Sequence, residues 1–71
     1  MLESGKIYKL YEIPRNSWIR FEGELMLFNK LDGMYSICMY RGEVCYLSAS
    51  ADVEYVGEFE GFEHVDGKEF K

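Results

Sequence analysis

Two glycine-containing dipeptides, Asp32-Gly33 and Arg41-Gly42, divide the middle of this chain into three short apolar runs at residues 24–31, 34–40 and 43–47. Asp-Gly between such runs is the strongest short-range signal for a β-hairpin, because both turn residues tolerate positive φ. Arg is a poor first residue for such a turn, so Arg41-Gly42 indicates a reversal but not its loop type. The pattern predicts a three-stranded antiparallel meander.

The register of this meander assigns its side chains to faces. A two-residue turn at Asp32-Gly33 sets Leu31 opposite Met34, and a symmetric second hairpin sets Cys38 opposite Cys45. One face then holds Met26, Phe28, Tyr35, Ile37, Met39, Val44 and Tyr46. The other face holds Leu25, Leu27, Asn29, Leu31, Met34, Ser36, Cys38, Tyr40, Cys45 and Leu47. Both faces are largely apolar, so we expect the rest of the chain or a partner to cover the second one.

The flanking segments add two further strands. Residues 6–13 are rich in β-branched and aromatic side chains and stop at Pro14, which predicts a first strand. Residues 18–22 alternate with a period of two and begin the second strand, with Gly23 as a bulge or bend inside it. The small polar residues 48–52 suit a 3₁₀ turn or one helical turn, and residues 53–59 predict the fifth strand.

The run from Tyr46 to Val56, a strand, a short polar turn and a terminal Val53-Glu54-Tyr55-Val56, resembles the end of an SH3-like barrel. The resemblance concerns the order of elements over residues 5–59 and implies a five-stranded antiparallel SH3-like barrel. The chain lacks the acidic, aromatic-rich first loop and paired Trp of proline-rich-peptide binders, so that activity is not implied. A five-stranded OB-like barrel is the nearest alternative. We therefore predict an all-β domain over residues 1–60, followed by an acidic C-terminal tail over residues 61–71.

Apolar content is high for a chain of this length. Apolar residues make up 48% of the 71 residues, yet a domain this small buries a modest share of its surface. Some apolar side chains should therefore meet a partner protein or a second copy of the chain. The predicted contact residues on the second face are Leu25, Leu27, Leu31, Tyr40 and Leu47.

The net charge of −5 is concentrated at the C-terminus. Residues 1–51 carry six acids and six bases, whereas residues 52–71 carry seven acids and two bases. In this segment acids alternate with aromatics, which predicts either a solubilising end or a segment that docks into a basic groove. The predicted docking residues are Glu58, Phe59, Glu60, Phe62 and Glu63.

Residues with catalytic or metal-binding chemistry are few and scattered. His64 is the sole histidine, and Ser48 and Ser50 have no nucleophile motif around them. Cys38 and Cys45 lack zinc-site spacing, so they are expected to pack as reduced thiols, with a redox role as the alternative. We expect no enzyme activity, no cofactor and no metal.

These observations favour a non-enzymatic protein-binding module. Size and composition are similar to those of small bacteriophage accessory proteins that act on host proteins. Two alternatives are a barrel that binds nucleic acid through exposed aromatics, which the dispersed bases oppose, and an acidic DNA mimic. No apolar stretch reaches the length of a signal peptide or membrane span, so we expect a cytoplasmic protein without membrane contact.

Overall fold

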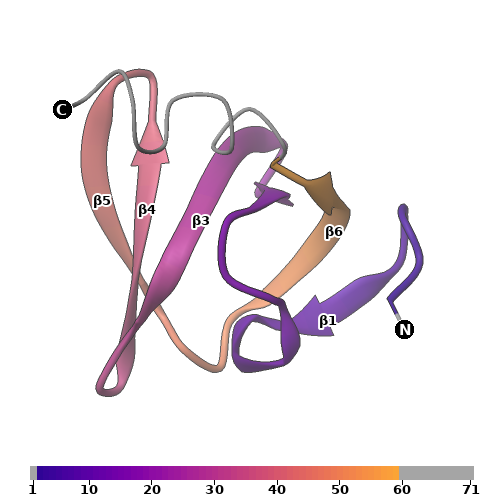
Figure 1. Ribbon diagram of the computed structural model, residues 1–71, viewed down its shortest axis with the longest axis horizontal. Helices are drawn as coiled ribbons and strands as arrows, with labels where there is room; N and C mark the ends of the chain where they lie inside the picture. Colours follow the sequence, from indigo (N-terminus) through magenta and orange to yellow (C-terminus); the bar gives the residue numbers. More distant parts are fainter. Residues whose placement is uncertain (1, 60–71) are drawn as a thin grey trace, which may run out of the picture.

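The computed structural model describes residues 2–59, and these residues build one antiparallel sheet (Figure 1). Its strands are β1 (Ile7–Lys9), β2 (Ser17–Phe21), β3 (Glu24–Asp32), β4 (Tyr35–Tyr40), β5 (Glu43–Ser48) and β6 (Asp52–Glu58). Their order in the sheet is β1-β6-β2-β3-β4-β5, so β1 and β5 are the edges. The all-β prediction is confirmed. The five-stranded SH3-like barrel is not, because the sheet has six strands and its edges do not pair.

The extra strand arises at Glu22-Gly23. Both residues have positive φ, 52° and 82°, and Phe21 pairs with Glu24 across them. This is a two-residue turn of the kind that matches the twist of a hairpin. The predicted single strand with a bend at Gly23 was therefore wrong, and the segment folds into β2 and β3.

The register between β3 and β4 also differs from the prediction. The turn consists of Gly33 and Met34, so Asp32 pairs with Tyr35. An irregularity between Phe28 and Lys30 then shifts the pairing by one residue, which moves side chains to the other face. As a result Phe28 lies opposite Cys38, although the predicted faces separated these two residues.

The second hairpin follows the predicted register. Tyr40 pairs with Glu43, and Cys38 pairs with Cys45. Arg41 adopts φ 54° and Gly42 φ 82°, so Arg occupies a conformation that few non-glycine residues take. The twist of the flanking strands and a glycine at the second position outweigh the poor preference of Arg for the first.

The first strand is shorter than predicted. It ends at Lys9, and a 3₁₀ turn, η1 (Leu10–Glu12), follows. The backbone N–H of Leu10 donates to the Ala51 carbonyl (2.9 Å), which ties this turn to the loop before β6. A continuous strand would point Leu10 and Ile13 to opposite sides, whereas η1 directs both into the core. The short turn expected at residues 48–52 is present, and it is closed by one hydrogen bond from the Ala51 N–H to the Ser48 carbonyl (3.0 Å).

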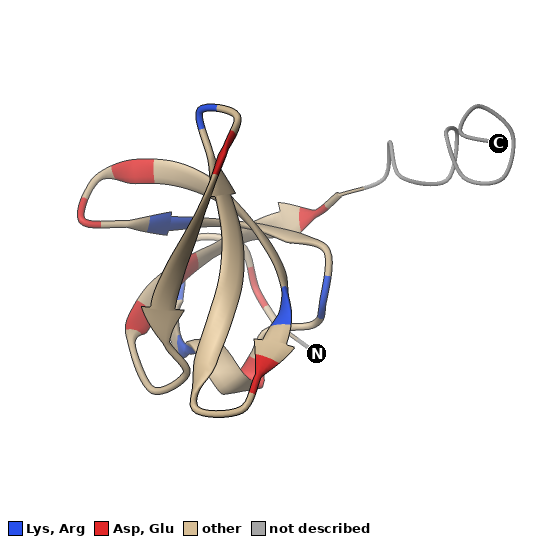
Figure 2. Cartoon of the chain, turned by 90° about the vertical axis from the view of Figure 1, so that its left-hand side faces the viewer, with Lys and Arg blue, Asp and Glu red and all other residues tan. Residues whose placement is uncertain are grey.

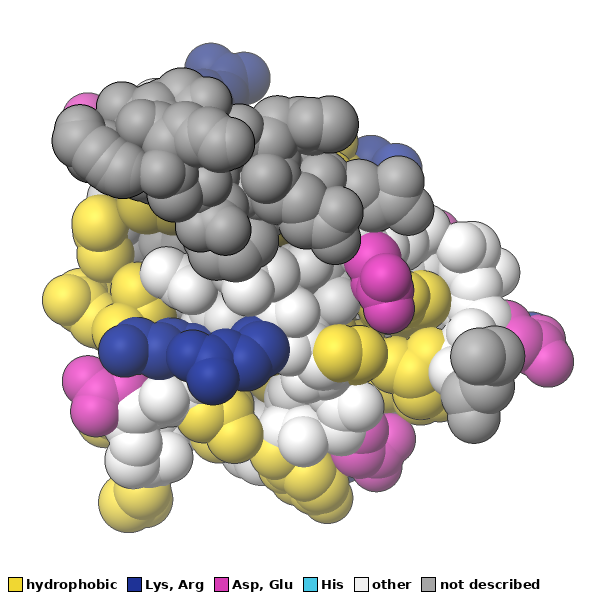
Figure 3. Space-filling view, viewed as in Figure 1, with side chains coloured by type: hydrophobic (Ala, Val, Ile, Leu, Met, Phe, Trp, Pro, Cys, Tyr) yellow, Lys and Arg dark blue, Asp and Glu magenta, His cyan; other side chains and the backbone are white. Residues whose placement is uncertain are grey.

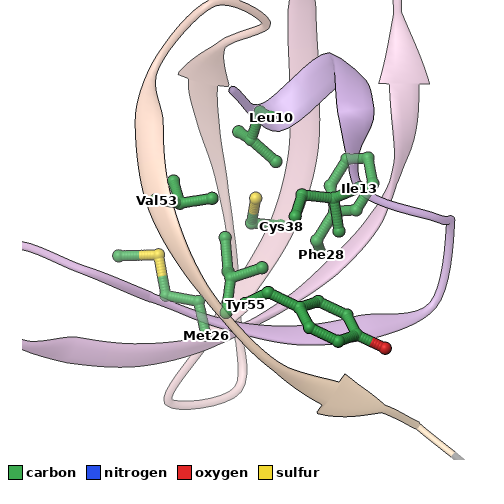
Figure 4. Close-up of a cluster of buried hydrophobic side chains, with 8 residues drawn as sticks. Leu10, Ile13, Met26, Phe28, Cys38, Val53 and Tyr55 are labelled. Carbon is green, nitrogen blue, oxygen red and sulfur yellow. The ribbon is translucent and has the colours of Figure 1, made fainter. Parts of the chain in front are cut away.

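The core lies on the inner side of the curled sheet (Figure 4). Every strand from β2 to β6 faces it, and η1 covers it; the buried apolar residues are Leu10, Ile13, Ile19, Met26, Phe28, Cys38, Val53 and Tyr55. Two buried polar residues are satisfied internally. The Ser17 hydroxyl donates to the Pro14 carbonyl (2.7 Å) and the Ser36 hydroxyl to the Leu47 carbonyl (3.1 Å). The buried hydroxyls therefore carry no desolvation penalty from missing partners.

The predicted tail, residues 61–71, lies outside the described residues. Within residues 2–59, no helix has the length and apolar character needed to cross a membrane.

Candidate protein-binding face and edge

An apolar row crosses four strands on the side of the sheet opposite the core. Trp18 on β2 pairs with Leu27 on β3, Leu27 with Met39 on β4, and Met39 with Val44 on β5. Ile37 and Tyr46 form a second pair beside this row. We call these six residues the outer apolar face: Trp18, Leu27, Ile37, Met39, Val44 and Tyr46.

The exposed end of this face is on β5. Val44 is 52% exposed and Tyr46 62%, whereas the other four members are half-buried. Trp18, at the opposite end, is packed edge-on against Phe59, with ring centres 5.7 Å apart. The apolar surface that is accessible to a partner is therefore richest at the sheet edge.

The backbone of β5 faces outward at the same residues. In a two-residue hairpin the closing pair, here Tyr40 and Glu43, is hydrogen-bonded, and such pairs alternate along the ladder. Glu43, Cys45 and Leu47 thus turn their N–H and C=O groups toward β4. Val44 and Tyr46 turn theirs away from the sheet, where no described strand pairs with them.

Natural sheets protect long edges with charges, proline, bulges or covering segments, because an open edge invites strand addition. The β5 edge has six residues with Glu43 as its single charge and no proline. The opposite edge, β1, has three residues, and its Lys9 forms an ion pair with Asp52 (2.9 Å). Of the two edges, β5 is the one left open to an added strand.

The rim near the β4–β5 turn is polar. The Tyr40 hydroxyl donates to the Glu24 carboxylate (2.6 Å), and this hydrogen bond is the main reason the pKa of Tyr40 is raised. The Arg41 guanidinium lies over the Tyr40 ring, 5.4 Å from its centre. These contacts position Tyr40 at the end of the hairpin.

The predicted apolar contact residues do not share one face. Leu25 and Leu27 lie on the outer side, with Leu25 exposed next to Arg20. Leu31, Tyr40 and Leu47 lie on the inner side, because Leu31 pairs with Ser36 and Leu47 packs against the core. The bulge between Phe28 and Lys30 is the physical reason for the separation.

The predicted acidic docking residues are only partly described. Glu58 is exposed at the end of β6, and Phe59 is half-buried against Trp18. Glu60, Phe62 and Glu63 lie outside the described residues.

A basic groove lies on another part of the surface. It has a volume of about 300 Å³ and is lined by Ile13, Arg15, Phe28, Lys30 and Leu31. Of the residues that line this groove, only Leu31 was predicted as a binding residue, and it was predicted as part of an apolar face rather than of a basic groove. Arg15 and Lys30 are single bases far apart in the sequence, on the loop before β2 and on β3, so no local pattern marks them as a pair.

Residues with metal-binding or thiol chemistry are few in the described part of the chain. No group of three or more His, Cys, Asp or Glu residues there could hold a metal ion. Cys38 is buried, and burial is the main reason its thiol pKa is raised. A raised thiol pKa disfavours the nucleophilic thiolate.

No family model, no curated protein and no solved structure matches this chain.

Sequence reasoning missed Trp18, Ile37, Met39, Val44 and Tyr46 as a binding surface. The predicted face that contains Ile37, Met39, Val44 and Tyr46 also contains Met26 and Phe28, which are core residues in the structure. Two sequence signals mark the β5 edge. One is the run Val44-Cys45-Tyr46-Leu47, which carries no charge, and the other is a following turn too short to cover it.

Proposed function

We propose that this protein is a non-enzymatic binding module that accepts an extended segment of a partner protein as an added strand on β5. The observation that carries the proposal is the coincidence at Val44 and Tyr46 of outward backbone groups and exposed apolar side chains. In strand addition, main-chain hydrogen bonds supply affinity and alternate side chains supply specificity. Both requirements are present at the same two residues.

The geometry of the edge defines the partner segment. Ladder residues that pair with Val44 and Tyr46 project their side chains to the same side as the outer apolar face. Their neighbours in the segment project toward the inner side, next to Cys45 and Leu47, which are half-buried. The expected partner is thus an extended segment with β-branched or aromatic residues at every second position and no proline at the pairing positions.

The charge distribution supports a protein over a nucleic-acid partner. Lys6, Lys9 and Arg20 form ion pairs with Glu3, Asp52 and Glu54. Lysine and arginine are interspersed with acids over the described chain (Figure 2). Binding to a phosphate backbone depends on clustered bases and falls steeply with salt, so a filter-binding series at low and moderate salt separates the two classes.

Three further expectations remain part of the proposal. The likeness to bacteriophage accessory proteins rests on size and composition alone, and the expected cytoplasmic location rests on the lack of an apolar stretch as long as a signal peptide or membrane span. Self-association would use the same edge, since β5 of a second copy can serve as the added strand. Light scattering at high micromolar concentration distinguishes a self-associating chain from one that needs a foreign partner.

Selection from a displayed library of random peptides against the full chain tests the function. We expect the bound peptides to share alternating apolar positions. Tyr46→Pro removes the outward N–H without touching the ladder to β4, because edge positions of this kind tolerate proline. Tyr46→Ala is the matched control, since it removes the ring and keeps the N–H.

We expect Tyr46→Pro to abolish peptide binding and Tyr46→Ala to weaken it only in part, with both variants keeping the β-type circular dichroism spectrum. Equal binding by the two variants would show that the backbone edge is not used and would refute strand addition.

A further inference from the structure

We infer that the C-terminal segment of this same chain, residues 60–71, occupies the basic groove between Arg15 and Lys30. This inference concerns a different surface from β5 and does not depend on strand addition. It rests on the chemistry of the groove, the place where the described chain ends, and the composition of the segment that follows.

The groove combines an apolar floor with a positively charged rim. Ile13 and Phe28 are buried residues that reach its floor, while Arg15 and Lys30 are exposed. Among the described residues, neither Arg15 nor Lys30 takes part in an ion pair, unlike Lys6, Lys9 and Arg20. In the space-filling view, Lys and Arg atoms over β3 lie between hydrophobic side chains (Figure 3). A ligand for this groove should carry an apolar group flanked by negative charges.

The described chain ends beside this groove. The backbone N–H of Phe59 donates to the Asn16 carbonyl (2.8 Å), and the N–H of Asn16 donates to the Asn29 carbonyl (3.0 Å). Asn16 is the neighbour of Arg15, and Asn29 is the neighbour of Lys30. The contact of Phe59 with Trp18 also holds this end of the chain. Phe59 therefore lies one strand spacing from Asn16 and two strand spacings, about 10 Å, from Asn29, a span that three or four residues of extended chain can cover.

The segment has the composition that the groove requires. Residues 60–71 carry four acids and two bases, with Phe62 and Phe70 as their aromatics. Phe62 is flanked by Glu60 and Glu63, so one aromatic side chain lies between two carboxylates. We assign Phe62 to the apolar floor and the two carboxylates to Arg15 and Lys30.

Attachment to the same chain favours this occupant over any other. A short tether gives a linked segment an effective concentration in the millimolar range, so weak contacts suffice for occupancy. The charge-assisted hydrogen bonds that Arg and Lys form with carboxylates add to the burial of the aromatic ring.

Zero-length carbodiimide cross-linking of the full chain, mapped by mass spectrometry, tests the inference. The reagent joins a lysine amine to a carboxylate in direct contact, and Lys30 is the one amine that lines the groove. We expect an amide between Lys30 and Glu60 or Glu63. In an equal mixture of ¹⁵N-labelled and unlabelled protein, the linked peptides should carry a single isotope, because both come from one chain.

Two cross-linking results would overturn the inference. One is the absence of any link between Lys30 and residues 60–71 under conditions in which Lys9 links to Asp52, its partner at 2.9 Å. The other is a set of Lys30 links that are isotopically mixed, which would place the segment of a second copy in the groove.

A second measurement keeps the inference testable without the reagent. Ring currents from Phe62 should shift the methyl NMR resonances of Ile13 and Leu31. We expect Phe62→Ala to move both resonances and Phe70→Ala, the matched control, to leave them in place. Unchanged Ile13 and Leu31 resonances in Phe62→Ala would exclude the assigned contact.

Discussion

Cys38 and Cys45 lie directly opposite each other on β4 and β5, yet only Cys38 is fully buried. Burial raises the pKa of the Cys38 thiol, a contact with the Ser36 hydroxyl lowers it, and the nearby Cys45 raises it further. The reactive species is the thiolate. We predict that iodoacetamide modifies Cys45 well before Cys38 in the native protein, as measured by peptide mass spectrometry over time. Faster modification of Cys38 would contradict the packing described here.

The raised pKa of Cys38 also predicts how stability depends on pH. A thiol whose pKa is higher in the folded than in the unfolded chain keeps its proton longer when folded. The free energy of unfolding should therefore fall as pH rises above roughly 8.5, the ordinary pKa of cysteine. The free energy of unfolding should be measured by denaturant only up to about pH 9.5, because tyrosine side chains have an ordinary pKa of roughly 10 and would add their own titration at higher pH. Cys38→Ala should remove this decline and Cys45→Ala should retain it; a decline that survives in Cys38→Ala would assign it to another group.

The turn between β2 and β3 offers a test of the six-strand topology. Glu22 has φ 52°, a conformation that Asn adopts more readily than Glu. We predict that Glu22→Asn raises the free energy of unfolding by about 0.5 kcal/mol, whereas Gly23→Ala lowers it by about 1 kcal/mol because φ is 82° there. Chemical denaturation of each variant measures its free energy of unfolding. If Gly23→Ala left the free energy of unfolding unchanged, residue 23 would not have positive φ, and β2 and β3 would be one strand.

The interruption of the first strand at Leu10 predicts a large cost for its removal. Leu10 is 0% exposed and packs with Ile13 and Val53, whereas Leu25 is 46% exposed on the outer side. Leu10→Ala should therefore lower the free energy of unfolding by about 2–5 kcal/mol. Leu25→Ala, the same change on the surface, should shift it by about 0.5 kcal/mol or less. Comparable effects of the two substitutions would contradict the placement of Leu10 in the core.

Much of the strand content of this fold could be predicted from local patterns. Alternation identified residues 18–22, and the Arg41-Gly42 reversal set the register that brings Cys38 opposite Cys45. These features depend on neighbours within a few residues, so local periodicity and turn chemistry are sufficient to find them.

The parts that could not be predicted depend on contacts distant in sequence. Glu22-Gly23 is a turn in a sheet where β2 pairs with β3 on one side and with the distant β6 on the other, and a single bent strand would lose the pairing with β3. The irregularity after Phe28 has no local signature, yet it decides which leucines face the core. For this reason the predicted binding face mixed inner and outer residues. The uncharged run at residues 44–47 marks a strand without charges to protect its edge, but the position of β5 at the edge of the sheet follows from the strand order.

The most direct test of strand addition on β5 is amide hydrogen exchange, followed by NMR, with and without a peptide chosen by library selection. In the unliganded protein, we predict fast exchange for the outward N–H groups of Val44 and Tyr46 and slower exchange for Cys45, which faces β4. Saturating peptide should slow Val44 and Tyr46 strongly and leave Cys45 nearly unchanged. Peptide binding without added protection at Val44 and Tyr46 would contradict the claim that the partner pairs with this edge.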